Sequence, residues 1–223
     1  SLPVLYKITG TWGNHEGSML LWVLVLSVFG LPLISSSLRE ETKYAIATQA
    51  TLAAGILLFI LLTSNPFARQ FPPPVDGDTL NPILQDVALA IHPPLLYIGY
   101  VGFSLVFSLA VAALITGRTG REFAKTARPW ILVSWLSLTL GIGLGSWWAY
   151  RELGWGGFWF WDPVENASLL PWLAGTALLH SNIVLEKRGQ LAPWVILLSI
   201  LTFGLSLLGT FLVRAGALTS VHS

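Results

Sequence analysis

Long apolar runs separated by short polar stretches make up most of the chain. Six runs reach the roughly 17 to 25 mostly apolar residues that a helix needs to cross a bilayer. We expect spans at about 18 to 34, 43 to 62, 93 to 116, 130 to 150, 167 to 185 and 191 to 213. The longest connection, residues 63 to 92, is rich in proline, glycine and aspartate, which favour turns outside the hydrocarbon. The pattern predicts an all-α fold, a polytopic transmembrane helix bundle that forms one membrane domain over residues 1 to 223.

Composition agrees with this class. Hydrophobic residues make up 54% of the chain and charged residues 10%, against about 25% charged residues in soluble proteins. The chain has no cysteine, which excludes disulfides, thiolate metal sites and iron–sulfur ligation by its own residues. It starts at Ser1 without a cleavable signal pattern and stops at Ser223 just beyond a span. We therefore expect a piece cut from a longer membrane protein.

The basic residues are distributed unequally between the two sides of the predicted bundle. One side carries eight, namely Arg39, Lys43, Arg118, Arg121, Lys125, Arg128, Lys187 and Arg188. The other carries four, namely Lys7, Arg69, Arg151 and Arg214. Cytoplasmic loops retain the excess of Lys and Arg, so the side with four faces away from the cytoplasm, which in a bacterium is the periplasm. The net charge of +1 gives no reason to expect nucleic-acid binding.

An aromatic loop joins the fourth and fifth spans on that outer side. Eight of the fifteen residues from 147 to 161 are aromatic, and five of the eleven tryptophans lie there. Such a loop favours a large, flat, partly charged ligand. The candidate cofactor-binding residues are Trp147, Arg151, Trp155, Gly156, Gly157, Phe158, Trp159, Phe160, Trp161, Asp162, Pro163, Glu165 and Asn166, with Arg214 at the end of the last span.

Each polar candidate also has a structural interpretation. Asp162 before Pro163 is typical of an N-cap followed by proline at the first helical position. Glu165 in the first turn suits the helix dipole. Arg151 and Arg214 either bind carboxylates of the ligand bidentately or are ordinary interface arginines.

Two histidines are expected on the outer side although they are far apart in the sequence. His92 precedes two prolines at the start of the third span, and His222 follows the sixth span. They would place one imidazole on each side of a planar ligand, which favours haem iron with aromatic cover. Zinc would need three or four clustered ligands. The alternative is that each is an ordinary helix-start or loop residue.

The other two histidines have different positions. His180 lies about fourteen residues into the fifth span, where an ionisable side chain is a candidate functional residue. It is either an iron ligand or a neutral imidazole hydrogen-bonded to a neighbouring helix. No second histidine is expected at that depth, so a bis-histidine haem there would need a ligand from outside the chain. His15 reads mainly as a polar residue at the entry of the first span.

Glycines recur on the fourth span below the aromatic loop, at Gly141, Gly143 and Gly145. Small residues let helices approach closely. They indicate either tight helix packing or room for a ligand.

Five motifs, in order along the chain, resemble a known family. They are WGNHEGS at 12–18, IHPPLLY at 91–97, WGGFWFWDPVEN at 155–166, ALLHS at 177–181 and LVRAG at 212–216. The third is similar to the tryptophan-rich WWD segment of haem-handling membrane proteins, here about residues 147–172. Together the motifs resemble the CcmF-type haem lyase subunits of bacterial cytochrome c maturation, over residues 11 to 222.

The resemblance implies a cytochrome c haem lyase of the bacterial inner membrane, acting as part of a complex. It implies that haem b arrives from a periplasmic haem chaperone. Its vinyl groups are then joined to the thiols of Cys-x-x-Cys-His in apocytochrome c, with thiol-handling and chaperone subunits as further partners. His92 and His222 match the external haem ligands, and His180 matches a ligand of a separate, buried b-type haem.

Two other functions remain open at this point. A haem exporter or carrier would use the same loop and external histidines and hand haem on without attaching it. A quinol-linked electron-transfer protein is suggested by His180, but it would need a second histidine at similar depth.

Overall fold

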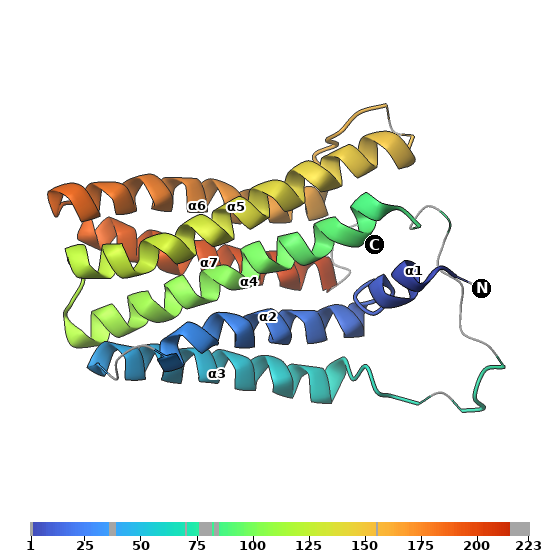
Figure 1. The fold of residues 1–223 in the computed structure, drawn as a ribbon, viewed down its shortest axis with the longest axis horizontal. Coiled ribbons are helices and arrows are strands. Elements are labelled where there is room, and N and C mark those ends of the chain that lie inside the picture. Colours follow the sequence, from blue (N-terminus) through green and yellow to red (C-terminus); the bar gives the residue numbers. More distant parts are fainter. Residues whose placement is uncertain are drawn as a thin grey trace.

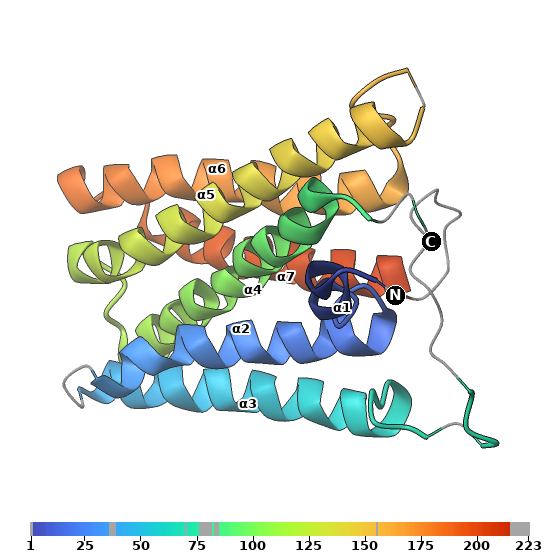
Figure 2. The ribbon, with the colours of Figure 1, turned by 45° about the vertical axis from the view of Figure 1, so that its right-hand side comes forward.

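The computed structural model describes residues 2–35, 39–69, 71–75, 82, 85–154 and 156–214. Within these residues the chain is all-helical, as predicted. The helices are α1 (Val4–Thr9), α2 (His15–Ser35), α3 (Glu40–Thr63), α4 (Val87–Thr116), α5 (Arg121–Glu152), α6 (Pro163–Arg188) and α7 (Ala192–Arg214). They lie side by side as a bundle in which the long helices alternate in direction (Figures 1 and 2).

Six of these helices, α2 to α7, are long and apolar enough to cross a membrane. The prediction of a polytopic bundle with six spans is therefore confirmed for the described residues. Two helices begin six or more residues before the predicted spans, whereas the other helix ends lie within four residues of them. α4 begins six residues earlier, at Val87, because Asp86 caps it by accepting hydrogen bonds from the N–H groups of Ala88 (2.7 Å) and Leu89 (3.3 Å). α5 begins nine residues earlier, at Arg121, because its polar first turns are helical although they are too charged to count as a span.

α4 is the central helix of the bundle and packs against α2, α3, α5 and α7. Its middle turns are fully buried, including Val101, Phe103 and Leu105. Close approach to α5 depends on Gly99, since a Cβ there would meet the Cβ of Leu138 at 2.6 Å. The backbones of α4 and α5 therefore meet almost in contact, and this fixes the start of α4 against the end of α5.

A buried amide joins α3 to the helices beside it. Gln49 of α3 is 5% exposed and donates to the carbonyl oxygen of Leu26 (3.1 Å) and to Ser104 Oγ (3.0 Å). It also accepts from Ser108 Oγ (2.8 Å). A buried amide needs such partners because water does not reach the interior of a membrane-spanning bundle to replace them. The network locks α2, α3 and α4 in one register.

The two ends of the bundle differ in chemistry. One end gathers α1, the starts of α2, α4 and α6, the ends of α3, α5 and α7, and the aromatic loop (Figure 1). The opposite end carries the larger group of basic residues, several of them ion-paired. Arg118 pairs with Glu41, Lys125 with Glu122 (2.9 Å) and Arg128 with Glu186 (3.3 Å).

Candidate functional site

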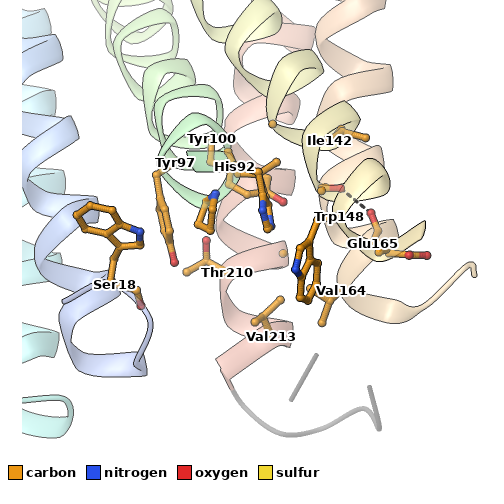
Figure 3. Close-up of a pocket in the computed structure, with 18 of the residues that line it drawn as sticks. Ser18, His92, Tyr97, Tyr100, Ile142, Trp148, Val164, Glu165, Thr210 and Val213 are labelled. Carbon is orange, nitrogen blue, oxygen red and sulfur yellow. Dashed lines mark hydrogen bonds between the residues drawn. The ribbon is translucent and has the colours of Figure 1, made fainter. Parts of the chain in front are cut away.

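A cavity of about 320 Å³ opens at the end of the bundle that carries the aromatic loop. Its wall is built from the start of α2, from α4, α5, α6 and α7, and from Trp159 of the loop. Figure 3 shows Ser18 of α2 and Val164 and Glu165 of α6 on opposite sides, with His92 of α4 between them. The volume lies near the lower end of the range of about 300 to 1,000 Å³ typical of ligand clefts.

His92 lies in the second turn of α4, and not before the helix as the two prolines suggested. The capping of α4 at Asp86 accounts for this difference, since it lets the helix run through Pro93 and Pro94. Pro93 and Pro94 are the seventh and eighth residues of the helix, so each leaves the carbonyl group four residues earlier without its usual backbone donor.

Three contacts fix the imidazole of His92. Its Nδ1 lies 3.0 Å from the carbonyl oxygen of Ala88. A carbonyl only accepts, so Nδ1 carries a proton, and in the neutral imidazole Nε2 then carries the lone pair. The ring stacks on the indole of Trp148, with centroids 5.9 Å apart and 26° between the planes. On α5, a Cβ added to Gly145 would lie 3.2 Å from Cδ2 of the ring. Of the three glycines singled out in the sequence, Gly145 thus leaves space for the histidine, whereas Gly141 packs against Leu96 and Gly143 has open space.

The aromatic residues divide into two groups. Trp148 and Trp159 line the cavity. Among the other described aromatic residues of this segment, five are largely exposed and do not line it, namely Trp147, Tyr150, Phe158, Phe160 and Trp161. Trp155 lies outside the described residues. Among the described aromatic residues that follow α5, Trp159 therefore lines the cavity, whereas Phe158, Phe160 and Trp161 are exposed.

The loop is tied to the first turn of α6 by a capping box. Asp162 Oδ2 accepts from the N–H of Val164 (2.9 Å), and Pro163 takes the first helical position. Glu165 Oε2 accepts from the N–H groups of Phe160 (2.8 Å) and Asp162 (3.2 Å). The capping interpretation of Asp162 is confirmed, and Glu165 acts as its reciprocal partner.

The loop backbone also contains left-handed residues. Gly156 has φ of 79°, which glycine adopts without strain, and Gly157 follows it. Trp161 has φ of 57°, which is uncommon for a bulky residue. Asn166 donates from Nδ2 to the carbonyl oxygen of Trp161 (2.9 Å) and so holds this conformation.

The two candidate arginines already bind groups of the protein. Arg214 lines the cavity and donates to the carbonyl oxygen of His15 (2.7 Å) and to Ser18 Oγ, which joins the end of α7 to the start of α2. Arg151 pairs with Asp86 and with Glu152 (3.2 Å), and its guanidinium lies 4.3 Å from the ring centroid of Trp147. Arg151 does not line the cavity.

His180 is apart from the cavity, and its side chain faces out of the described bundle. Nδ1 lies 2.8 Å from the carbonyl oxygen of Thr176, one turn earlier on α6. Beside it, two indoles stack between α5 and α6 with centroids 6.2 Å apart. Trp135 donates to Thr176 Oγ1 (2.9 Å) and Trp172 donates to Thr139 Oγ1 (2.8 Å). His222 lies outside the described residues.

Sequence reasoning missed several residues of the cavity wall. Tyr97 and Tyr100 of α4 and Trp12 before α2 line it, and His15 lines it beside Trp12. Tyr100 lies eight residues after His92, so the helical spacing could have placed it on the same face, whereas Tyr97 lies five residues after His92 and is not placed there by spacing. Trp12 and His15 come close to the cavity only through the packing of the helices, which the sequence does not show.

These features define a class of protein, namely a multi-pass membrane protein with a histidine and tryptophan cavity at one end of its helices. Residues 12–218 match the family described as Cytochrome C assembly protein, and the chain belongs to this family. It is 64% identical to the cytochrome c-type biogenesis protein CycK of Bradyrhizobium diazoefficiens over 99% of this chain and 34% of that protein. It is 55% identical to the cytochrome c-type biogenesis protein CcmF of Escherichia coli over 100% of this chain and 35% of that protein.

A solved structure shows the same fold. The chain superposes on Cytochrome c Heme Lyase CcmF with a TM-score of 0.83 and 34% identity, over 95% of this chain and 34% of that one. The predicted resemblance to CcmF-type subunits is thus confirmed. The chain spans about a third of the length of these relatives.

Proposed function

We propose that this chain is the haem-holding part of a cytochrome c haem lyase. In this proposal it presents haem b at the periplasmic face of the bacterial inner membrane for covalent attachment to Cys-x-x-Cys-His apocytochromes. The observation that carries the proposal is the fixed imidazole of His92 on the wall of an aromatic cavity. Support from relatives is that one similar solved protein is titled a cytochrome c haem lyase.

The residues present suit haem. Iron takes a neutral imidazole through the nitrogen that carries the lone pair, and the bond from Nδ1 to Ala88 assigns that lone pair to Nε2. Trp148 and Trp159 offer flat apolar surface to a porphyrin. Within the described residues no group of three or more histidines, cysteines and carboxylates is placed to hold a metal ion directly. This favours iron that arrives already held by a macrocycle.

His222 supplies the second external ligand in this proposal. α7 ends at Arg214, whose side chain lines the cavity. His222 follows Arg214 by eight positions in the sequence.

The contribution of this chain to the reaction is to position the reacting groups. Each cysteine thiol of the apocytochrome adds across a vinyl double bond of its substrate haem. An S–H bond and a π bond are replaced by a C–S and a C–H bond, and no electrons are gained or lost. The protein holds the reacting groups together, and orientation of this kind lowers a barrier by several kcal/mol. Glu165, the carboxylate on the wall, serves as a helix cap and is not needed as an acid or base.

His180 would hold a separate b-type haem as a resident cofactor. Its bond to Thr176 leaves Nε2 as the nitrogen with the lone pair, and the side chain faces out of the described bundle. The other axial ligand would come from outside this chain. This second haem would supply electrons. The stacked indoles of Trp135 and Trp172 pack α5 against α6 beside His180.

The proposed partners follow from the reaction. They are a periplasmic haem chaperone, apocytochrome c and the thiol-handling and chaperone subunits of the maturation complex. The lipid bilayer surrounds the helices. The unequal distribution of basic residues supports the periplasmic placement of the site.

The test is covalent haem attachment by the full-length protein in its complex. The haem-loaded complex is incubated with reduced Cys-x-x-Cys-His apocytochrome, and haem that survives denaturation on the cytochrome is measured. We expect attachment with the unaltered protein and a loss of about tenfold or more with His92→Gly. Added imidazole should restore part of the activity, because it replaces the missing ligand. Transfer of haem without a thioether would instead support the haem carrier.

A further inference from the structure

Two buried indole N–H groups on the cavity wall lack a hydrogen-bond partner within the described part of the chain. They are Nε1 of Trp148 and Nε1 of Trp159. Trp148 is 5% exposed and comes from the last turns of α5, whereas Trp159 comes from the aromatic loop. Buried tryptophan N–H groups usually find an acceptor, so each unmatched one needs an explanation.

Other tryptophans of the same helix pair show that the fold can supply acceptors. Trp135 of α5 and Trp172 of α6 each donate to a threonine hydroxyl of the opposite helix, at 2.9 and 2.8 Å. These two indoles lie away from the cavity wall. The indoles of Trp148 and Trp159 therefore differ from those of Trp135 and Trp172, because they lack an acceptor within the described residues.

The charged groups of the wall are engaged elsewhere. Arg214 donates to His15 and Ser18, and Glu165 accepts from Phe160 and Asp162. The donors that remain for a ligand include the two indoles, and that of Trp148 stacks on His92 (Figure 3). A ligand that completes this wall must present acceptors at its edge.

We propose that Trp148 and Trp159 recognise a carboxylate of the ligand through their indole N–H groups. The inference rests on the proposed function and deepens it, because the only strong hydrogen-bond acceptors on the rim of haem are its two propionates. The indoles are positioning residues. By binding a propionate, they turn the propionate edge of the macrocycle toward the protein. The edge that carries the vinyl groups then faces the incoming thiols.

The experiment compares two porphyrins in full-length protein. One is haem and the other is an iron porphyrin that carries alkyl groups in place of both propionates. Trp148→Phe and Trp159→Phe keep an aromatic ring and remove the N–H. Each should weaken haem binding about tenfold, the effect of one hydrogen bond to a charged acceptor, and leave binding of the alkyl porphyrin unchanged.

Trp22→Phe is the matched control. Trp22 is fully buried beside Phe203, its Nε1 also lacks a partner within the described residues, and it does not line the cavity. Its replacement should change neither affinity. The propionate bending frequency in the resonance Raman spectrum of bound haem should shift in Trp148→Phe and Trp159→Phe alone, which a merely structural role would not cause.

The outcomes separate the two proposals. If the variants lose haem and the alkyl porphyrin equally, or lose neither, the assignment of the indoles is overturned while haem binding stands. If the unaltered protein binds neither porphyrin, the proposed function fails and this inference fails with it. If Trp148→Phe does not fold, Trp159→Phe in the loop decides the question by the same criteria.

Discussion

Gly145 provides the space that the imidazole of His92 occupies. The ring is bounded by Trp148 on one face, by its own helix through Ala88 and by Gly145 across the interface with α5. A ligand bond from Nε2 has a direction set by these contacts, since side chains held by packing keep the geometry that a site requires.

Gly145→Ala should disturb this arrangement without removing a ligand. The new methyl group would lie 3.2 Å from Cδ2 of His92, closer than ordinary van der Waals contact, so the ring must move. Overpacking of this kind costs about 1 to 3 kcal/mol. We expect haem affinity of the full-length protein to fall about tenfold, measured by titration of the Soret band.

Gly143→Ala is the control for that change. It lies two residues earlier on α5, where an added Cβ meets nothing within 4 Å. Its haem affinity should equal that of the unaltered protein. Equal affinities in all three proteins would mean that the position of His92 does not control binding.

At the residue scale, several residues predicted from the sequence line the candidate cavity. His92, Trp159, Glu165 and Arg214 were predicted and all line the cavity. The sequence could not show that Trp148 faces inward while Trp147 faces outward, because that depends on the rotation of α5 against α4. Nor could it show that both arginines bind partners within the protein.

The capping box at the start of α6 connects a helix to the loop that precedes it. Asp162 and Glu165 hold the backbone of residues 160 to 164 by hydrogen bonds. Trp159 directly precedes this segment, so the position of its side chain depends on the same hydrogen bonds. A change at the cap therefore acts on the cavity through the loop.

Asp162→Ala should loosen the loop. Loss of an N-cap costs about 1 kcal/mol, and the N–H of Val164 would lose its acceptor. We expect faster hydrogen exchange over residues 156 to 165 and weaker haem retention, measured by mass spectrometry and by the rate of haem loss. Asp162→Asn keeps an N-capping acceptor and should resemble the unaltered protein, so equal exchange in Asp162→Ala and Asp162→Asn would contradict a capping role.

At the element scale, hydropathy predicted the spans but not the helix ends. Mean hydropathy marks where a helix is apolar, whereas Asp86 and Arg121 begin helices in polar sequence. Pro93 and Pro94 predict a helix start, yet the helix is capped at Asp86, about two turns earlier. The length of α4 before the prolines brings His92 into the bundle.

The two ends of the bundle predict its orientation in the membrane, since the larger group of basic residues lies at one end and the aromatic loop at the other. These 223 residues contain no cysteine, so a single introduced cysteine is the only thiol label in this part of the protein. Phe67→Cys lies in the exposed connection between α3 and α4, and Gly120→Cys lies between α4 and α5.

In the full-length protein in bacterial cells with a permeabilised outer membrane, a membrane-impermeant maleimide should label Phe67→Cys. Gly120→Cys should react only after the inner membrane is opened. The physical reason is retention of the more basic loops in the cytoplasm. The reverse pattern of labelling would place the cavity on the cytoplasmic side.

The cavity wall is assembled from five helices and a loop that are distant in the sequence. Any cargo that fills it therefore binds the assembled bundle and has no equivalent site in a chain whose helices have come apart. By mass action, such cargo at a hundred times its dissociation constant adds about 2.7 kcal/mol to the free energy of unfolding. The occupied protein should therefore unfold less often than the empty one, and so resist proteases that cleave the unfolded chain.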